Sequence, residues 1–479
     1  AAAKTASKAA PSETCFICND IGFRRCLGNG PFLACSPNVQ SRPPLRLALL
    51  IAATLAGPVV LTGSVRTGGG AQSRPAPVPT APPVVSVPSQ PAVTRLFPAE
   101  RGRIRADGSV FRDENGGIWD WRGATMFMLP ARFRRGEDIT PQIRWMQKHG
   151  VNVARVFIAG TQGGSEFNEY IRPWEDKNFE IWLGAFFDRM AAEGLRVEAT
   201  VFTSDDLDAA TAKQVLQRVY NVASTRWNVF VEWFNEPWVG RRQALLDTLM
   251  TMGVDRKGVL SAYGIQPERE GEGYKPCPVL DYVTPHLPRD REGFPRNPKE
   301  LMAIQSAVRV PAVNDEPLGV IDPARYRDWC DRGNSQWSNC ANGGGARTTD
   351  RTALVSHFAI CRLFGAGCTV HTQAGLEGRA PGPDEPLTES LMAAVSEVWR
   401  FIPADAQSGR YSAPHLGRFP LAWAGGDSLI NHAYARIVGD RAFAVNPMPR
   451  RGWVAKGTDG WTTDGVMANS PFVVRLRRP

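Results

Sequence analysis

Hydrophobic and polar positions follow two alternating periods along the chain from residue 123 onward. Runs rich in β-branched and aromatic residues are typical of buried strands, and they alternate with segments of 3.6-residue periodicity that are typical of helices. The strand-like runs are residues 123–129, 151–160, 195–203, 228–238, 258–264, 281–288, 310–317 and 367–373. The helical patterns cover residues 140–150, 179–194, 208–222, 299–308, 351–364 and 387–402.

This order predicts an α/β fold, a (β/α)8 TIM barrel over residues 99–405. Eight strands that alternate with helices fit a closed parallel barrel better than an open doubly wound sheet. No Gly-x-Gly-x-x-Gly follows an early strand, which removes the commonest dinucleotide-binding pattern. Thr140 and Pro141 are expected to be the N-cap and the first residue of the helix that ends near Gly150.

Short β-rich segments flank the barrel pattern on both sides. Two alternating runs around Asn115-Gly116-Gly117 predict a β-hairpin before the first barrel strand. After residue 405 the helical period disappears, and residues 406–479 predict a small C-terminal β-sheet domain or a strand appendage packed on the barrel. Its strand-like runs are residues 421–425, 428–438, 441–447, 452–456 and 472–478.

The N-terminal part of the chain has a different pattern. Residues 45–73 contain an apolar run behind Arg42 and Arg46 and then small residues up to Ala71, which is typical of a secretory signal. The run is short for a membrane-spanning helix and is interrupted at Gly57-Pro58. We therefore expect a secreted or periplasmic protein, with a membrane anchor at the same segment as the alternative.

The segments on either side of this signal-like run are expected to lie outside the folded part. Residues 1–44 are interpreted as upstream sequence read in frame, and they are not expected to belong to the native protein. The proline-rich residues 74–98 are predicted to form an extended tether, since such a composition cannot build a core.

Charge does not point to a nucleic-acid partner. The net charge is +9, but +7 of it lies in residues 1–98, which leaves +2 on the other 381 residues. A nearly neutral body offers no basic surface for a polyanion. The sequence makes no prediction of the oligomeric state.

The nine cysteines allow several interpretations. Residues 15–35 begin with Cys-x-x-Cys, but the later spacings do not repeat the pair, so a zinc module is not favoured. In an exported protein, Cys330–Cys340 is one disulfide pairing and Cys361–Cys368 is a second. An entirely reduced set is an equal alternative.

Two glutamates stand where barrel enzymes carry their reactive groups. Glu236 follows the fourth strand pattern in VFVEWFNEPW, and Glu316 follows the seventh in VNDEP, with Asp315 as the alternative. Carboxylates at the carboxyl ends of two barrel strands suit glycosidic bond cleavage, in which one protonates the leaving oxygen and the other attacks or stabilises the sugar. Glu232 lies about 13 Å deeper on the same strand, so a structural ion pair is expected for it.

The fourth strand pattern resembles that of clan A glycoside hydrolases, in particular glycoside hydrolase family 5, which includes cellulases and mannanases. The resemblance covers roughly residues 100–405. It implies a retaining mechanism with Glu236 as acid/base and Glu316 as nucleophile. It also implies that Asn235 contacts a sugar 2-hydroxyl, that Arg155 lies near the nucleophile, and that His286 is the strand-six histidine.

The sequence departs from the family 5 pattern at two places. Pro288 stands where a tyrosine is common, and the strand-eight tryptophan platform is absent from GCTVHTQ, where His371 is the candidate pocket residue. Trp238 is a candidate sugar-stacking platform, because aromatic faces pack on sugar rings.

Other residues near these strands have simpler interpretations. Trp233 should point the opposite way to Glu232, into the helical layer. Asp205 and Asp206 are more simply explained as caps of the following helix than as substrate contacts.

The predicted function is cleavage of O-glycosidic bonds, β-configured by the resemblance, in an oligo- or polysaccharide. The partner is a carbohydrate substrate, and no metal or organic cofactor is needed. The alternative is a non-catalytic carbohydrate-binding barrel. A metal-dependent hydrolase is disfavoured, because the chain has six histidines and no His-x-His.

Overall fold

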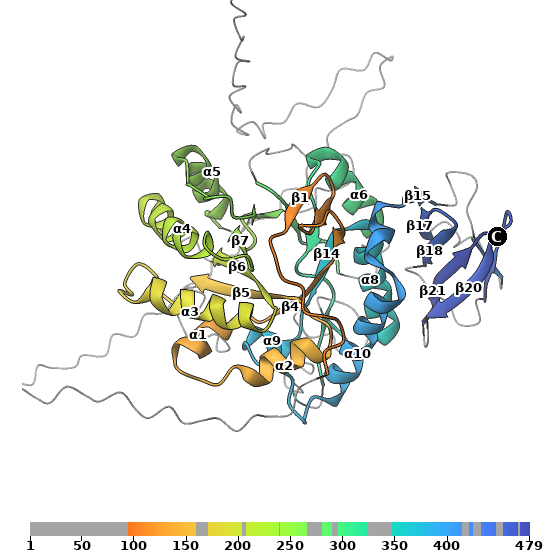
Figure 1. The fold of residues 1–479 in the computed structure, drawn as a ribbon, viewed down its shortest axis with the longest axis horizontal. Helices are drawn as coiled ribbons and strands as arrows, with labels where there is room; N and C mark the ends of the chain where they lie inside the picture. The colour runs from red at the N-terminus through yellow and green to blue at the C-terminus, as the bar shows by residue number, and fades with distance from the viewer. Residues whose placement is uncertain are drawn as a thin grey trace, which may run out of the picture. The chain divides into compact units, whose positions relative to one another are not determined.

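Parallel strands at eight barrel positions, one of which is divided into β8 and β9, form the centre of the molecule in a computed structural model (Figure 1). The sheet runs in the order β11-β14-β4-β5-β6-β7-β8, and β9, which follows β8 after Tyr263, pairs with β10. A parallel bridge from Val283 to Ala312 joins β10 to β11 and closes the ring. The strands are β4 (Trp121–Thr125), β5 (Val153–Ala159), β6 (Arg196–Phe202), β7 (Val229–Phe234), β8 (Ser261–Ala262), β9 (Gly264–Ile265), β10 (Thr284–Pro285), β11 (Val313–Asn314) and β14 (Gly367–Val370).

The predicted (β/α)8 TIM barrel is therefore confirmed. The first strand lies slightly earlier than expected, because the chain turns at Met126 and helix α1 begins at Leu129. The structure describes residues 94–159, 171–203, 207–238, 240–265, 280–289, 296–323, 325, 347–413, 421–424, 433–446, 454–467 and 470–479.

Several predictions fall on residues that the structure does not describe. They are the upstream segment 1–44, the signal-like segment 45–73, most of the tether 74–98, and the pairing of Cys330 with Cys340, which all stay predictions. Asp205 and Asp206 also lie outside the described residues, but their predicted role as helix caps is wrong, because Asp208 caps α4 (Ala209–Ala223) and accepts the Thr211 backbone N–H at 3.0 Å. In the described residues, no helix combines the length and the apolar character needed to cross a membrane.

Helices cover the outside of the barrel. Trp233 of β7 points into this layer as predicted, and its indole nitrogen donates to the Tyr220 hydroxyl of α4 at 2.6 Å. Thr140 is the first residue of α2 and not its cap, since the Asp138 carboxylate accepts the Thr140 backbone N–H. The helices are α1 (Leu129–Arg134), α2 (Thr140–Lys148), α3 (Phe179–Ala192), α4 (Ala209–Ala223), α5 (Arg242–Met252), α6 (Asn297–Val308), α8 (Arg351–Phe364), α9 (Gln373–Leu376) and α10 (Pro386–Phe401).

The predicted hairpin closes the amino end of the barrel. Strand β2 (Val110–Arg112) pairs with β3 (Ile118–Trp119) across the Asn115-Gly116-Gly117 turn, and β1 (Arg105–Asp107) extends the sheet. Phe111 and Trp119 pack on Trp121, whose ring lies within 6.0 Å of both. Because this aromatic plug fills one end, the opposite end is left for a site.

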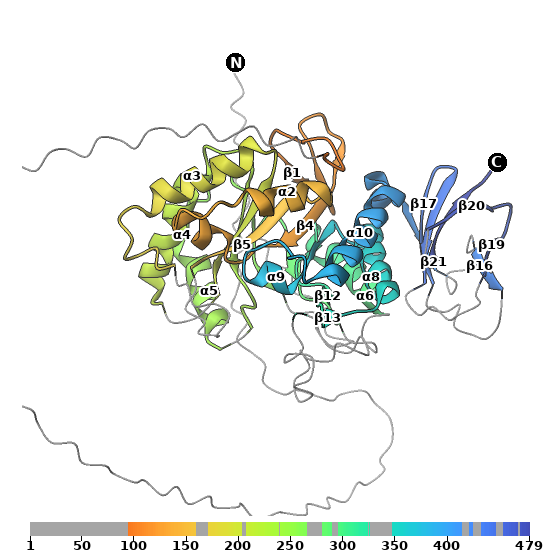
Figure 2. The same ribbon diagram turned by 90° about the horizontal axis from the view of Figure 1, so that it is seen from below.

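The C-terminal part forms the predicted antiparallel sheet (Figure 2), which follows a short 3-10 helix at Ala404–Ser408. Arg436 donates to the Leu363 carbonyl at 2.9 Å, and the Tyr434 ring meets Phe364, so the sheet packs against α8. The sheet runs β15 (Arg410–Ser412), β17 (Tyr434–Val438), β18 (Arg441–Val445), β21 (Ser470–Arg477) and β20 (Thr462–Met467). Two pairs stand apart, β16 (Leu421–Ala424) with β19 (Val454–Gly457) and β12 (Gly319–Val320) with β13 (Arg347–Thr348).

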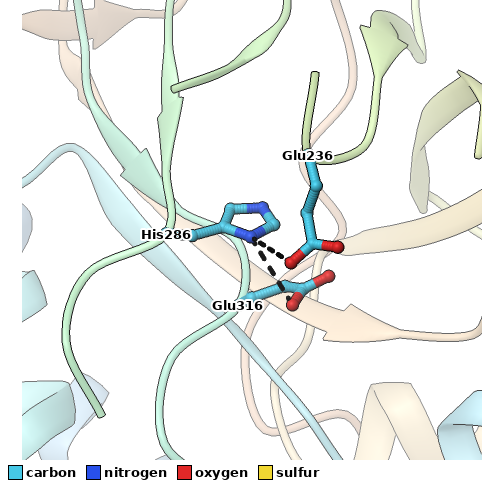
Figure 3. Close-up of side chains that lie close together, drawn as sticks. All are labelled: Glu236, His286 and Glu316. Carbon is cyan, nitrogen blue, oxygen red and sulfur yellow. Dashed lines mark ion pairs between the residues drawn. The ribbon is translucent and has the colours of Figure 1, made fainter. Parts of the chain in front are cut away.

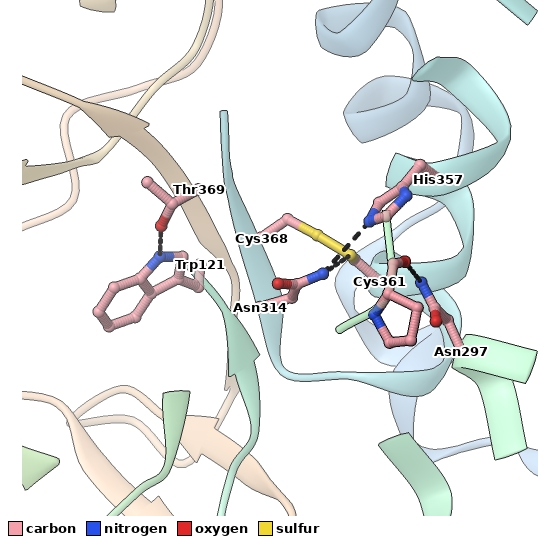
Figure 4. The surroundings of a disulfide bond; sticks show 8 residues. Trp121, Asn297, Asn314, His357, Cys361, Cys368 and Thr369 are labelled. Carbon is pink, nitrogen blue, oxygen red and sulfur yellow. Dashed lines mark hydrogen bonds between the residues drawn. A yellow bond between two sulfur atoms is a disulfide. The ribbon is translucent and has the colours of Figure 1, made fainter. Parts of the chain in front are cut away.

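A disulfide joins Cys361 of α8 to Cys368 of β14 (Figure 4). This confirms the second of the two pairings considered from the sequence. The amide nitrogen of Asn314 lies 3.2 Å from the His357 ring and 3.9 Å from the Cys361 sulfur. The disulfide therefore links barrel strand β14 to helix α8, and it lies next to Asn314 of β11.

Candidate active site

Glu236 stands at the carboxyl end of β7, where the backbone turns sharply. Its φ is 50°, in the left-handed region that residues other than glycine seldom adopt. Strand β9 passes close by, and a Cβ on Gly264 would lie 3.2 Å from the Glu236 nitrogen, so only glycine fits there without displacement. A strained backbone held by its surroundings is common at functional sites.

The structure brings Glu236, His286 and Glu316 together at the carboxyl end of the barrel (Figure 3). One carboxylate oxygen of each glutamate and a ring nitrogen of His286 lie within 4.8 Å of one another. The His286 Nδ1 atom is 3.5 Å from Glu236 and 3.6 Å from Glu316. These residues, which we call the mouth group, come from three different strand ends.

Arg155 of β5 holds the base of the mouth group. Its guanidinium lies 3.2 Å from Glu316, 2.7 Å from Asp315 and 2.9 Å from Glu232. It also donates to the side-chain oxygen of Asn235 at 2.8 Å. Arg155 thus lies beside the candidate nucleophile, where the sequence resemblance placed it, and Glu232 forms the predicted structural ion pair.

A second set of acidic residues lies deeper in the barrel. Oxygens of Glu198, Glu232 and Asp315 approach within 4.8 Å of one another, and all three side chains are fully buried. We call them the inner group. Thr200 and Thr284 each donate to Glu232 at 2.6 Å, and the Tyr282 hydroxyl donates to Glu198 at 2.9 Å. Hydrogen bonds therefore satisfy both oxygens of Glu232, whereas the Oε2 atom of Glu198 is buried without a hydrogen-bond partner.

Nearby cations keep Glu316 ionised. Burial alone would raise the pKa of Glu316, but the charges of His286, Arg155 and Arg289 outweigh it and hold the pKa well below its usual value. Arg289 follows β10, and its guanidinium is 3.3 Å from Glu316. Burial would likewise lower the pKa of His286, but the carboxylates of Glu316 and Asp315 raise it to about 10. The ring is therefore a cation at neutral pH.

Burial has the opposite outcome in the inner group. It raises the pKa of Glu198 well above its usual value, and the charges of Glu232 and Asp315 add to the effect. The nearest Arg155 nitrogen is 3.9 Å from Glu198, too far for a hydrogen bond. Burial also raises the pKa of Glu232 to about 7, although Arg155 opposes it. Burial therefore favours the neutral form of Glu198.

Two further predicted residues line the region of the mouth group. Trp238 is half-buried and meets the His286 ring edge to face, with ring centres 5.0 Å apart. His371 is buried after β14, with its Nδ1 atom 3.2 Å from the Thr125 hydroxyl and its ring 5.8 Å from Phe127. Each predicted site residue thus lies at the same end of the barrel as Glu236.

Comparison with solved structures identifies the fold. A structure described as a glycoside hydrolase matches 79% of this chain and 97% of its own, with a TM-score of 0.55 and 12% identity. A glycoside hydrolase family 5 structure from Bacteroides vulgatus ATCC 8482 matches 79% and 94%, with a TM-score of 0.53 and 12% identity. The chain has the fold of a family 5 glycoside hydrolase. No protein-family model and no curated protein matches the sequence.

Neither acidic group has the chemistry of a good metal site. The mouth and inner groups of this family 5 fold each gather three potential ligand atoms. A protonated imidazole has no lone pair for a metal, and the pKa of His286 is raised to about 10. In the inner group the guanidinium of Arg155 already lies 2.7 Å from Asp315 and 2.9 Å from Glu232. The carboxylates of both groups are therefore better matched to the His286 imidazolium and the Arg155 guanidinium than to a metal ion.

Sequence reasoning missed three residues around the mouth group and the inner group. Asp315 was considered only as an alternative nucleophile, but it lies fully buried below Glu316. Glu198 was not considered, although a carboxylate inside the apolar run LRVEATVFT is a signal like that of Glu232. Arg289 had no signal, because it belongs to a loop after a two-residue strand.

Proposed function

We propose that the protein is a retaining glycoside hydrolase that cleaves β-configured O-glycosidic bonds of an oligo- or polysaccharide. The observation that supports this most directly is the pair Glu236 and Glu316, with carboxylate oxygens within 4.8 Å of each other. Retaining enzymes hold their two carboxyl groups about 5–5.5 Å apart, whereas inverting enzymes need about 6.5–9.5 Å to admit a water. The fold supports the same class of reaction.

In this proposal Glu316 is the nucleophile. Its contacts with Arg155 and Arg289 keep it ionised, which attack on the anomeric carbon requires. Glu236 donates a proton to the leaving oxygen and then removes one from the water that hydrolyses the glycosyl-enzyme. The side-chain oxygen of Asn235 accepts a hydrogen bond from Arg155, and the amide nitrogen of Asn235 donates to a sugar hydroxyl.

The test is hydrolysis of a panel of aryl β-glycosides and of plant and microbial polysaccharides. The wild type should release product of the same anomeric configuration as the substrate, as followed by NMR. Glu316→Ala should lose this activity and keep the fold. An inverted product would contradict the retaining mechanism, and full activity of Glu316→Ala would contradict the nucleophile. Saccharide binding without hydrolysis would favour a carbohydrate-binding barrel.

We also propose that the protein is exported. The signal-like residues 45–73 support this, as does the Cys361–Cys368 disulfide, because disulfides persist mainly in oxidising compartments. N-terminal sequencing of the mature protein should find a start near residue 72. A mature chain that retains residues 45–73 in the membrane fraction would instead indicate an anchor.

A further inference from the structure

Asp315 contacts both cationic groups at the base of the mouth group. Its side chain is fully buried directly after β11. One oxygen lies 2.7 Å from the Arg155 guanidinium, and the other lies 3.2 Å from the His286 Nε2 atom. Arg155 and His286 each also contact Glu316. Asp315 therefore reaches the candidate nucleophile only through other side chains.

These contacts fix the direction of the His286 ring. With Nε2 turned inward to Asp315, Nδ1 points to the barrel mouth, where it lies 3.5 Å from Glu236 and 3.6 Å from Glu316. The edge contact with Trp238 restrains the ring from the side. A ring with carboxylates at both nitrogens is most stable when both nitrogens carry a proton, as an imidazolium.

We propose that Asp315 is a positioning residue that keeps His286 doubly protonated and aimed between Glu236 and Glu316. This inference rests on the proposed glycosidase function, and it assigns the charge of the ring to a fully buried residue that reaches Glu316 only through Arg155 and His286. The imidazolium reduces the repulsion between two carboxylates that must lie close together, one of them ionised. Without Asp315 the ring would lose its proton at a lower pH and could turn away.

The charges around His286 come from several elements. The carboxylate of Glu236 approaches from the end of β7, and those of Asp315 and Glu316 approach from the end of β11. The cations Arg155 and Arg289 lie behind these carboxylates and offset part of their charge. Of the three carboxylates, Asp315 is the only one with no proposed role in bond cleavage. Its removal therefore isolates the effect on the ring.

The first test is Asp315→Asn, which keeps the shape and removes the charge. We expect the alkaline limb of the kcat pH profile to move by about one unit or more toward acid, with little change in KM. Glu198→Gln is the matched control, a change at a buried carboxyl of the inner group whose neutral form burial favours and which has no ion pair with His286. Its profile should be that of the wild type. If the alkaline limb of the kcat profile lay at the same pH in Asp315→Asn as in the wild type, the proposal would be overturned.

A second measurement does not depend on catalytic activity. Selective 15N labelling of histidine reports the protonation of both ring nitrogens, and the His286 signal is assigned by its absence in His286→Gln. In the wild type both nitrogens should be protonated at pH 8. In Asp315→Asn the midpoint of the His286 titration should lie at a lower pH than in the wild type. A neutral ring at pH 8 in the wild type would overturn the proposal. Absence of hydrolysis with a protonated ring would instead contradict only the proposed function.

Discussion

The mouth group and the inner group each contain two glutamates, and they behave differently. Each gathers three titratable side chains within 4.8 Å, and each contains a glutamate from the β7 segment. Glu236 in the mouth group keeps 29% of its side chain exposed, whereas Glu232, four residues earlier, is fully buried. The mouth group contains an imidazolium, whereas burial raises the pKa of Glu198 in the inner group. Depth and the nearby cations separate the two groups.

This difference shows how one barrel supports two kinds of carboxylate. In the mouth group, cations outweigh burial, so the pKa of Glu316 falls below its usual value. In the inner group, burial outweighs the single guanidinium of Arg155, so the pKa of Glu198 rises. Ionised groups are needed where a bond is to be attacked, and neutral or paired groups are tolerated where only packing is required.

The largest expected effect comes from removing the proton donor of the mouth group. Glu236→Gln should lower kcat on an oligosaccharide by about 10³-fold or more, because the leaving oxygen then departs without a proton. The change keeps the size of the side chain and does not remove Glu316. Steady-state kinetics on reducing-sugar release measure it.

The substrate provides the control for this variant. A dinitrophenyl glycoside has a leaving group that needs no protonation, so the first step should stay close to the wild-type rate and give a burst of dinitrophenol. If the variant gave no dinitrophenol burst and lost activity equally on both substrates, the assignment of Glu236 as acid/base would be contradicted.

The second effect concerns Arg155, the cation that both groups share. Arg155→Met leaves Glu232 and Asp315 buried without their guanidinium, which should lower the free energy of unfolding by about 3–5 kcal/mol at pH 7. The loss should shrink as the pH falls below about 4, because the carboxylates are then protonated in both states. Urea unfolding followed by tryptophan fluorescence measures it. Arg155→Lys should lose less, since it keeps the charge, and a loss independent of pH would argue against an electrostatic role.

The sequence predicted the two sides of the barrel unequally. The long strands β5, β6 and β7 were recognised, and with β7 the carboxylates Glu232 and Glu236, because a charge inside a long apolar run is conspicuous; Arg155 of β5 was located by the family resemblance. On the other side β10 and β11 have two residues each, and their site residues lie on the segments that follow. There the strand-end pattern VNDEP located Glu316, and the resemblance located His286. The position of Asp315 below Glu316 depends on a turn that no periodicity encodes.

A smaller effect is expected at the rim of the mouth group. Trp238 packs edge to face on His286 and keeps part of its ring exposed. If a sugar stacks on it, Trp238→Ala should raise KM by about tenfold or less, which corresponds to one aromatic contact. Trp238→Phe should restore most of the affinity. A fall in kcat with unchanged KM would show that the ring acts on His286 and not on the substrate.

The smallest effect should appear in the inner group, and its sign is the most informative. The folded-state pKa of Glu198 lies above its unfolded value, so the folded protein binds this proton more tightly, and stability is lost as the pH rises above about 4.5. Glu198→Gln has no such proton. Its unfolding free energy should match the wild type near pH 4 and exceed it increasingly toward pH 8, by up to about 1.4 kcal/mol for each pH unit within the shift. Urea unfolding at pH 4, 6 and 8 measures the difference. A variant that becomes less stable than the wild type as the pH rises would mean that Glu198 is ionised and paired. In that case the inner group would be a second charged site like the mouth group, and the contrast between the two would not hold.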